Sequence, residues 1–318
     1  MPNIAVVLGA GGIVGAAYHA GVLTALDEAG FDARRAGLFV GTSAGSGVAA
    51  TLRAGFPPAD LAPRHLGQPI SAEGAAIVGR TGGPPSIKFR PQPTSRVPRP
   101  SSPKLMFHAM RHPGKAFAGL MPTGTISTDV IGERIDLLYR NVSWPTRPLW
   151  ICAVDLDSGE RVVFGRDGAR ASVGTAVQAS SSIPGFFRPV AHEGRRYVDG
   201  GTHSPTNADL VADQGFDLVV VVSPMSATTA SQNGAWPSAR PLHARQLAGE
   251  VKRIRATGTD VLTFQPSPAD VAAMGRNAMN AARRPATTEA ALMSARSRLA
   301  DPAVADRLEL LRSVSRSG

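Results

Sequence analysis

Ile4-Ala5-Val6-Val7-Leu8 is a short apolar run that leads directly into the glycine-rich run Gly9-Ala10-Gly11-Gly12-Ile13-Val14-Gly15. An uninterrupted apolar run rich in β-branched residues is typical of a strand buried in a parallel sheet. Residues 16–29 then have the apolar spacing of a helix that stops at Gly30. A second buried strand is predicted at Leu38-Phe39-Val40, with a turn and a helix after it. This order predicts an α/β fold whose mostly parallel sheet is covered by helices on both faces.

The rest of the sequence favours one domain over residues 1–318. Further strands are predicted at 149–156, 161–164, 195–198, 218–222 and 260–264. The stretch of about 57–122 is rich in Pro, Gly, Ser and Arg, so we expect an irregular insertion with a short helix near 104–110. Residues of about 266–318 are expected to form a helical C-terminal tail.

The charge is concentrated in that insertion. The chain carries 34 Lys and Arg against 24 Asp and Glu, a net charge of +10. No acidic residue lies between Gly74 and Thr128, where the cations are Arg80, Lys88, Arg90, Arg96, Arg99, Lys104, Arg111 and Lys115. Residues 80–115 therefore either form a solvated loop or contact an anionic membrane peripherally. Nucleic acid is not an expected partner, because no recognised nucleic-acid-binding fold accompanies the charge.

Cysteine content and hydropathy bear on the compartment. The single cysteine, Cys152, lies in a predicted buried strand and cannot form a disulfide within the chain. No secretory signal and no apolar run of about 20 residues is found. We therefore expect a cytoplasmic protein. The basic segment at 80–115 suggests that it also contacts a membrane peripherally.

Gly41-Thr42-Ser43-Ala44-Gly45 fits the G-x-S-x-G pattern of a nucleophile elbow, between a predicted strand and a predicted helix. A serine on such a sharp turn projects its hydroxyl above the sheet, and Gly41 and Gly45 leave room for the tight backbone. The start of the helix favours negative charge that develops nearby. The pattern thus predicts Ser43 as a nucleophile; the alternative is a packed turn with a helix-capping serine.

The glycine-rich run after the first strand has three interpretations. A dinucleotide site would need a third glycine where Val14 stands, and an acidic residue closing the second strand, and neither is present. An oxyanion hole needs backbone N–H groups that converge on one point, which Gly11, Gly12 and Ile13 could supply. The third interpretation is a turn required only for tight packing.

Tyr197-Val198-Asp199-Gly200-Gly201 ends a predicted strand with an aspartate and two glycines. The glycines leave open space beside a rigidly held carboxylate, which suits an aspartate that contacts a serine hydroxyl. On its own the sequence Asp-Gly-Gly is also an ordinary turn.

Taken together, these three blocks resemble those of the patatin-like phospholipases, in the order that the family has them. The resemblance extends to Ala20-Gly21-Val22-Leu23 in the first helix and to Ala179–Phe187 before the aspartate, and it covers roughly residues 3–225. It implies a three-layer α/β sandwich with a Ser43–Asp199 dyad, an oxyanion hole at the glycine block, and no metal or other cofactor. One departure stands out: the family has an Arg or Lys close to the last glycine of that block, where this chain has Val14 and Gly15.

The histidines leave a triad as the alternative to the dyad. His203 and His243 stand late in the chain, where elbow enzymes place their histidine. The remaining histidines have no metal-ligand spacing, so no metal site is predicted. The expected function is hydrolysis of carboxylic esters of phospholipids, lysophospholipids or glycerides. The alternatives are a carboxylesterase for soluble esters, a non-catalytic membrane-surface protein with the same fold and, least favoured, a dinucleotide-dependent oxidoreductase.

Overall fold

The structure is a computed structural model that describes residues 2–82, 101–102, 113–140, 142–168, 170–227 and 239–316. These residues form one sheet of eight strands in the order β5-β6-β3-β2-β1-β7-β8, with β4 paired to β3. The strands are β1 Ile4–Leu8, β2 Leu38–Thr42, β3 Leu149–Asp155, β4 Arg161–Phe164, β5 Val190–His192, β6 Arg195–Asp199, β7 Leu218–Val222 and β8 Asp260–Phe264. The five strands from β3 to β8 in this order are parallel, whereas β4 and β6 run antiparallel to β3 and β5 runs antiparallel to β6.

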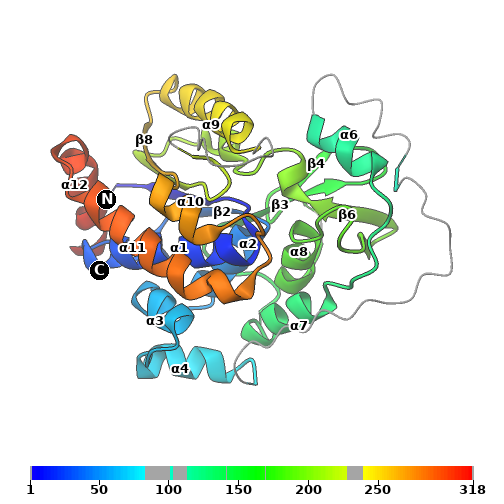
Figure 1. Ribbon diagram of the computed structural model, residues 1–318, viewed down its shortest axis with the longest axis horizontal. Coiled ribbons are helices and arrows are strands. Elements are labelled where there is room, and N and C mark those ends of the chain that lie inside the picture. Colours follow the sequence, from blue (N-terminus) through cyan, green and yellow to red (C-terminus); the bar gives the residue numbers. More distant parts are fainter. Residues whose placement is uncertain are drawn as a thin grey trace.

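Helices cover both faces of this sheet (Figure 1). They are α1 Gly12–Glu28, α2 Ala44–Arg53, α3 Leu61–Leu66, α4 Ala72–Gly79, α6 Pro113–Leu120, α7 Asp129–Leu138, α8 Val173–Ser180, α9 Arg240–Arg255, α10 Pro268–Met274, α11 Arg284–Leu299 and α12 Ala305–Arg316. The core on one face takes side chains from α1, α2, α8 and α11, and the core on the other face takes them from α9. The predicted α/β fold with a mostly parallel, doubly covered sheet is confirmed.

The apolar run of β1 explains this layering. Ile4, Val6 and Leu8 belong to the core beneath α1 and α2, whereas Ala5 and Val7 belong to the core beneath α9. Successive side chains of a strand point to opposite faces, so a strand covered on both sides must be apolar throughout. All five residues are accordingly buried.

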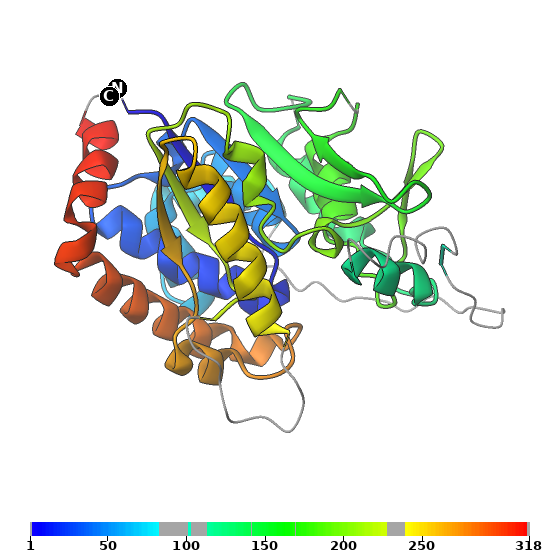
Figure 2. The ribbon, with the colours of Figure 1, turned by 90° about the horizontal axis from the view of Figure 1, so that it is seen from above.

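The C-terminal helices are part of the main core. Figure 2 shows α11 alongside α1, and side chains of α11 and α12 join the larger core. The two helices approach closely at Gly21, where an added Cβ atom would lie 2.6 Å from Leu292 N and from Thr288 O. Thr288 also donates its hydroxyl to the Ala17 carbonyl at 3.3 Å. The residues expected as a tail therefore complete the layer that carries α1.

The stretch of about 57–122 is more helical than its composition suggested. It contains α3, α4, α6 and a short 3-10 helix at Pro58–Asp60. Ser71 caps α4 by accepting a hydrogen bond from Gly74 N, and its own hydroxyl donates to the buried Asp60 carboxylate. Such local caps stabilise short helices that an average over composition does not predict. The short helix expected near 104–110 lies outside the described residues, and strand β5 was not predicted.

In the described ranges, no helix combines the length and the apolar character that crossing a bilayer requires.

Candidate active site

Ser43 occupies the turn between β2 and α2 in a strained backbone conformation. Its φ is 53° and its ψ is −122°, a region that non-glycine residues enter only where the surrounding structure enforces it. The two flanking glycines meet that requirement. A Cβ atom on Gly41 would lie 2.6 Å from Ser46 Cα, and one on Gly45 would lie 2.0 Å from the Leu8 carbonyl oxygen. The predicted elbow therefore has the expected geometry at the carboxyl end of a central strand.

The backbone of the turn is held by Ser180, at the end of α8. Ser43 N donates to Ser180 Oγ at 2.8 Å, and the Ser180 hydroxyl donates to the Cys152 carbonyl of β3 at 2.6 Å. Ser46 Oγ donates to the Ser43 carbonyl at 2.6 Å. These bonds fix the turn relative to β3, and they use the Ser43 N–H group. Sequence analysis gave Ser180 no role, although it lies in the 179–187 block.

Asp199 ends β6, where it pairs with Ala153 of β3. Its carboxylate accepts a hydrogen bond from Gly201 N at 2.7 Å and another from the Ser43 side chain. Burial raises the pKa of Asp199 to about 6, and the two hydrogen bonds offset part of that rise. An added Cβ at Gly200 would lie 2.3 Å from the Cys152 carbonyl oxygen, so this glycine lets the turn after Asp199 pack on β3. The structure thus brings Ser43 and Asp199 together.

The glycine block carries unused donors beside the pair. Gly9 N donates to Val222 O, Ala10 N to Pro205 O, Val14 N to Ala278 O and Gly15 N to Gly11 O. Within the part of the chain that the structure describes, the N–H groups of Gly11, Gly12 and Ile13 have no such acceptor. Gly12 has a φ of 61°, which turns the backbone at the start of α1. Among the described residues, these three consecutive N–H groups are therefore without an acceptor.

All three blocks meet at one edge of the sheet. An added Cβ at Gly45 would lie 2.8 Å from the Gly9 carbonyl oxygen, and one at Gly201 would lie 3.4 Å from the Ala10 side chain. The carboxyl ends of neighbouring parallel strands lie at the same edge of a sheet. For this reason β1 and β2 deliver the glycine block and Ser43 to one place.

A polar cluster behind Asp199 positions the loop that follows it. Asn207 has a φ of 51° and donates from its amide to Thr42 Oγ1 at 3.1 Å and to the Ser204 carbonyl at 2.6 Å. The buried Glu250 carboxylate of α9 accepts hydrogen bonds from the hydroxyls of Ser204 and Thr206. This cluster ties the end of β2 to the segment after Asp199. The sequence offered no periodic signal for it, because its members come from three distant segments.

His19 supports the glycine block from within the core. Its Nε2 lies 2.7 Å from the Gly9 carbonyl oxygen, and its ring is fully buried. Burial lowers the pKa of His19 to about 4, so the ring is neutral near pH 7 and can donate to that carbonyl. The role of His19 is therefore structural.

A cation does lie close to the block, although not at Val14. Val14 is buried, and its N–H is bonded to Ala278 O. Arg240 donates to the Pro224 carbonyl at 2.7 Å, and Pro224 packs against Gly11 and Gly15. The basic residue that the family has in its glycine block is therefore absent here, while an arginine from α9 approaches the same loop from outside.

Neither of the two candidate triad histidines is among the groups that shift the pKa of Asp199. The groups that shift the Asp199 pKa are Ser43 and Gly201, whereas the charge of His203 acts on Asp209. His243, on α9, has its pKa lowered by burial and by Arg240. Among the described residues no cluster of His, Cys, Asp or Glu is suited to holding a metal ion.

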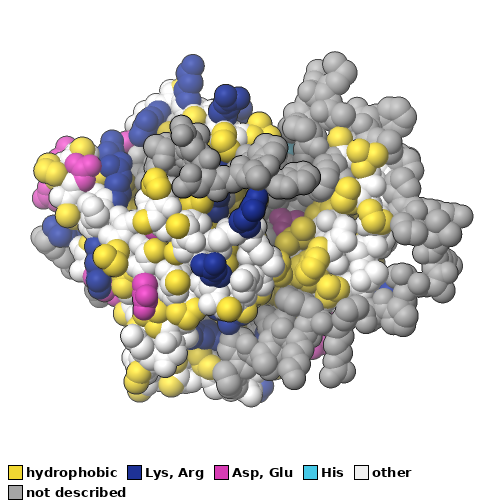
Figure 3. Space-filling view, viewed as in Figure 1, with side chains coloured by type: hydrophobic (Ala, Val, Ile, Leu, Met, Phe, Trp, Pro, Cys, Tyr) yellow, Lys and Arg dark blue, Asp and Glu magenta, His cyan; other side chains and the backbone are white. Residues whose placement is uncertain are grey.

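Apolar side chains are exposed at the surface next to α6 and α8. Leu120, at the end of α6, is 49% exposed, and Phe186, which follows α8, is 40% exposed. Phe186 packs edge-on against Phe187. Met121, the residue after Leu120, lies against Gly185, the residue before Phe186. Figure 3 shows hydrophobic side chains gathered on this face around the position of α8 in Figure 1.

The fold and site together define an α/β protein with an elbow serine, a buried aspartate bonded to it and a glycine loop with free donors. The sequence model of the family described as Patatin-like phospholipase matches residues 111–212, a range that includes Asp199. This match confirms the predicted resemblance to the family over that part of the chain. The chain is also similar to VipD from Legionella pneumophila, with 15% identity, 93% of this chain and 67% of that chain covered, and a TM-score of 0.44.

Proposed function

We propose that this protein is a serine acyl hydrolase that cleaves carboxylic esters of lipids through a Ser43–Asp199 dyad. The observation that carries the proposal is the hydrogen bond of the Ser43 side chain to a buried carboxylate, on a strained turn beside three free N–H groups. A nucleophile, a base and oxyanion donors are the parts that acyl transfer requires.

The proposed reaction proceeds in two halves. Asp199 accepts the Ser43 proton as Ser43 Oγ bonds to the acyl carbon, and the N–H groups of Gly11, Gly12 and Ile13 donate to the resulting oxyanion. The intermediate collapses as the alcohol leaves with the proton from Asp199. Asp199 then takes a proton from water, the hydroxide attacks the acyl-enzyme, and Ser43 recovers its hydrogen as the carboxylic acid departs.

A lipid is the favoured substrate because of the apolar surface at Leu120 and Phe186. Exposed apolar groups beside a site indicate an apolar ligand or interface. The missing basic residue at Val14 removes one feature that would favour a phospholipid over a glyceride. A carboxylesterase for soluble esters remains the second candidate. Hydrolysis of an ester series of increasing chain length, measured above and below the aggregation concentration, distinguishes the two.

The test of the dyad uses matched side-chain removals. Ser43→Ala should lower turnover by several orders of magnitude and abolish labelling by a fluorophosphonate probe, because the nucleophilic oxygen is gone. His203→Ala and His243→Ala should retain activity within a few-fold. Retention of most activity by Ser43→Ala would refute the assignment, as would tight binding of a nicotinamide cofactor. A folded but inactive histidine variant would instead establish a triad.

A further inference from the structure

A cavity lies at the carboxyl end of α2, whereas Ser43 lies at the amino end of that helix. It has a volume of about 680 Å³, within the range of about 300–1,000 Å³ that is usual for small-molecule sites. It is formed where α2 and α7 end, and α2 is ten residues long. At a rise of 1.5 Å per residue, the cavity is therefore roughly 15 Å from Ser43 along that helix. It is a separate site.

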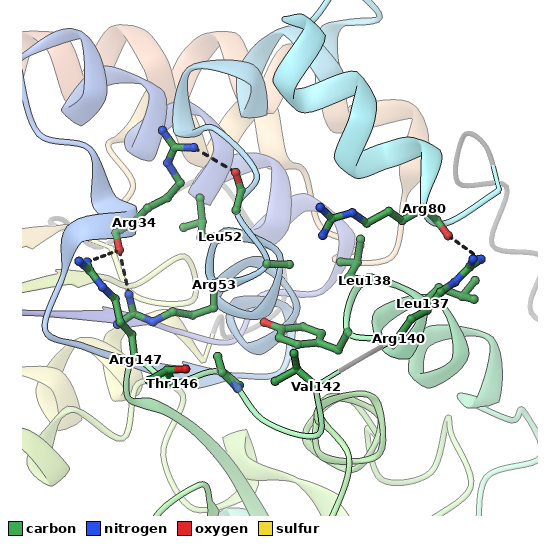
Figure 4. A pocket seen from close by; sticks show the side chains of 14 residues that line it. Arg34, Leu52, Arg53, Arg80, Leu137, Leu138, Arg140, Val142, Thr146 and Arg147 are labelled. Carbon is green, nitrogen blue, oxygen red and sulfur yellow. Dashed lines mark hydrogen bonds between the residues drawn. The ribbon is translucent and has the colours of Figure 1, made fainter.

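Arginines stand on two sides of this cavity (Figure 4). Arg34, Arg53 and Arg147 lie on one side, and Arg80 and Arg140 on the other. The wall between them is largely apolar, and its members are Leu52, Leu137, Leu138, Tyr139 and Val142. The cavity thus combines cationic ends with an apolar middle.

The charge of these arginines is mostly uncompensated. Arg34 is paired with Asp32 and Glu73. The other four form no ion pair with any carboxylate that the structure describes: Arg53, Arg80, Arg140 and Arg147. The side chains of Arg53, Arg140 and Arg147 donate to backbone carbonyls, and Arg53 and Arg147 both donate to the Arg34 carbonyl. Such bonds occupy donors but leave the positive charges in place.

Helix dipoles do not cancel this surplus. The carboxyl ends of α2 and α7 each contribute roughly half a negative charge near the cavity. Four guanidinium groups outweigh them. Burial, and after it the proximity of Arg147, lowers the pKa of Arg53 to about 10, which is the response of a buried cation that lacks an anionic neighbour.

We propose that this cavity binds an amphipathic anion, a hydrocarbon chain that ends in a carboxylate or a phosphate group. The arginines on its rim pair with the acidic head, and Leu138 and Val142 contact the chain. Arginine suits both head groups, because its planar fork donates two hydrogen bonds to either. This proposal is independent of the chemistry at Ser43.

The test measures binding of four probes to the full chain by calorimetry, each below its aggregation concentration. Decanoate and decyl phosphate present the two head groups, decanol lacks the charge, and inorganic phosphate lacks the chain. One of the two amphipathic anions should bind at least tenfold more tightly than both decanol and inorganic phosphate, and the tighter one identifies the head group. Equal binding of decanol, or of inorganic phosphate, would overturn the proposal.

Variants locate the binding. Arg140→Gln combined with Arg147→Gln should weaken the amphipathic anion at least tenfold. The control, Arg245→Gln with Lys252→Gln on the exposed side of α9, removes the same charge and should change affinity less than twofold. Val142→Asp, at a side chain 51% exposed, adds a carboxylate to the wall without removing an arginine and should also weaken binding tenfold. Unchanged binding in the folded pocket variants, or an equal loss in the control, would refute the assignment.

Discussion

Burial of Ser43 and Asp199 destabilises the ionised carboxylate of Asp199 and raises its pKa. The two residues are 4% and 5% exposed. A carboxylate removed from water is destabilised, and its pKa rises until it approaches the pH at which the protein works. At about 6, the pKa of Asp199 leaves the group ionised at neutral pH, yet makes it a better base than an exposed aspartate. Two donated hydrogen bonds keep the ionised form accessible.

The first prediction at this scale concerns pH. Activity on a soluble ester should rise with pH through a midpoint of about 6, because Asp199 accepts a proton only when ionised. Below that midpoint the protonated carboxyl cannot serve as base. The profile of kcat/KM against pH for the full chain measures it. A midpoint near 4 would mean that Asp199 titrates as an exposed carboxyl and that the burial argument is wrong.

The second prediction at this scale concerns how much the buried Asp199 carboxylate lowers the free energy of unfolding. A folded-state pKa of about 6 against an ordinary 3.8 means that the folded chain binds more protons between pH 4 and 6. The contribution of Asp199 to the free energy of unfolding is therefore most favourable below about pH 4. It falls by about 3 kcal/mol as the pH rises through 6. Asp199→Asn should remove this loss, so the variant should be inactive yet more stable than the parent at pH 7.

Urea unfolding at pH 4 and at pH 7 checks this. The free energy of unfolding of the parent should drop between these values by more than that of Asp199→Asn. Ser43→Ala is the comparison variant: it retains the carboxylate but loses a hydrogen bond that lowers the pKa of Asp199, so its free energy of unfolding should drop at least as much as that of the parent. If both variants followed the same pH dependence as the parent, Asp199 would not be the group responsible.

At the scale of elements, the contact between α1 and α11 determines where the glycine block lies. The block is the start of α1, and its Val14 N–H is bonded to Ala278 in the segment just before α11. Gly21 allows the two helix backbones to touch. The site loop is consequently held from its far side by the last part of the chain.

Gly21→Ala should therefore destabilise the protein, by on the order of 1–3 kcal/mol, because its methyl group would overlap the backbone of α11. Gly249→Ala is the matched control. That position is also in a helix, but an added Cβ there meets nothing within 4 Å. Alanine should stabilise it by roughly 0.5–1 kcal/mol. The midpoints of thermal unfolding of the two variants test this prediction. If both substitutions changed the midpoint equally, α1 and α11 would not be tightly packed.

At the scale of the whole molecule, the net charge of +10 suggests association with anionic surfaces. Most of residues 80–115 lie outside the described residues. Of its two described cations, Arg80 lines the arginine-lined cavity and Lys115 is buried, where desolvation lowers its pKa. Contact of residues 80–115 with an anionic membrane stays a prediction, and its test uses other cations of the segment than these two.

Replacing Arg90, Arg96, Arg99 and Lys104 by Gln should reduce binding to anionic vesicles at low salt. Each cation near such a surface contributes about 1 kcal/mol, and salt screens the attraction within a Debye length. Soluble-ester turnover should not change. The control replaces Arg245, Lys252, Arg253 and Arg255 of α9, which removes equal charge. Sedimentation with vesicles measures both, and an equal loss would assign the effect to net charge alone.

The sequence by itself predicted seven of the eight strands and the residues that we propose for the chemistry. The apolar runs at 4–8, 38–40 and 218–222 predict buried parallel strands, because only a strand covered on both faces lacks polar positions. The elbow and the Asp-Gly-Gly turn predicted Ser43 and Asp199, because tight turns restrict residue type locally.

Only the tertiary structure decided which groups act on one another. The bonds from Ser43 to Ser180, from Asn207 to Thr42 and from Val14 to Ala278 join segments far apart in the chain. The raised pKa of Asp199 follows from burial by all of the layers together. The arginine-lined cavity likewise draws on α2, α4 and the residues around the end of α7. Such long-range contacts leave no period or motif in the sequence, since each depends on how the packed layers fit.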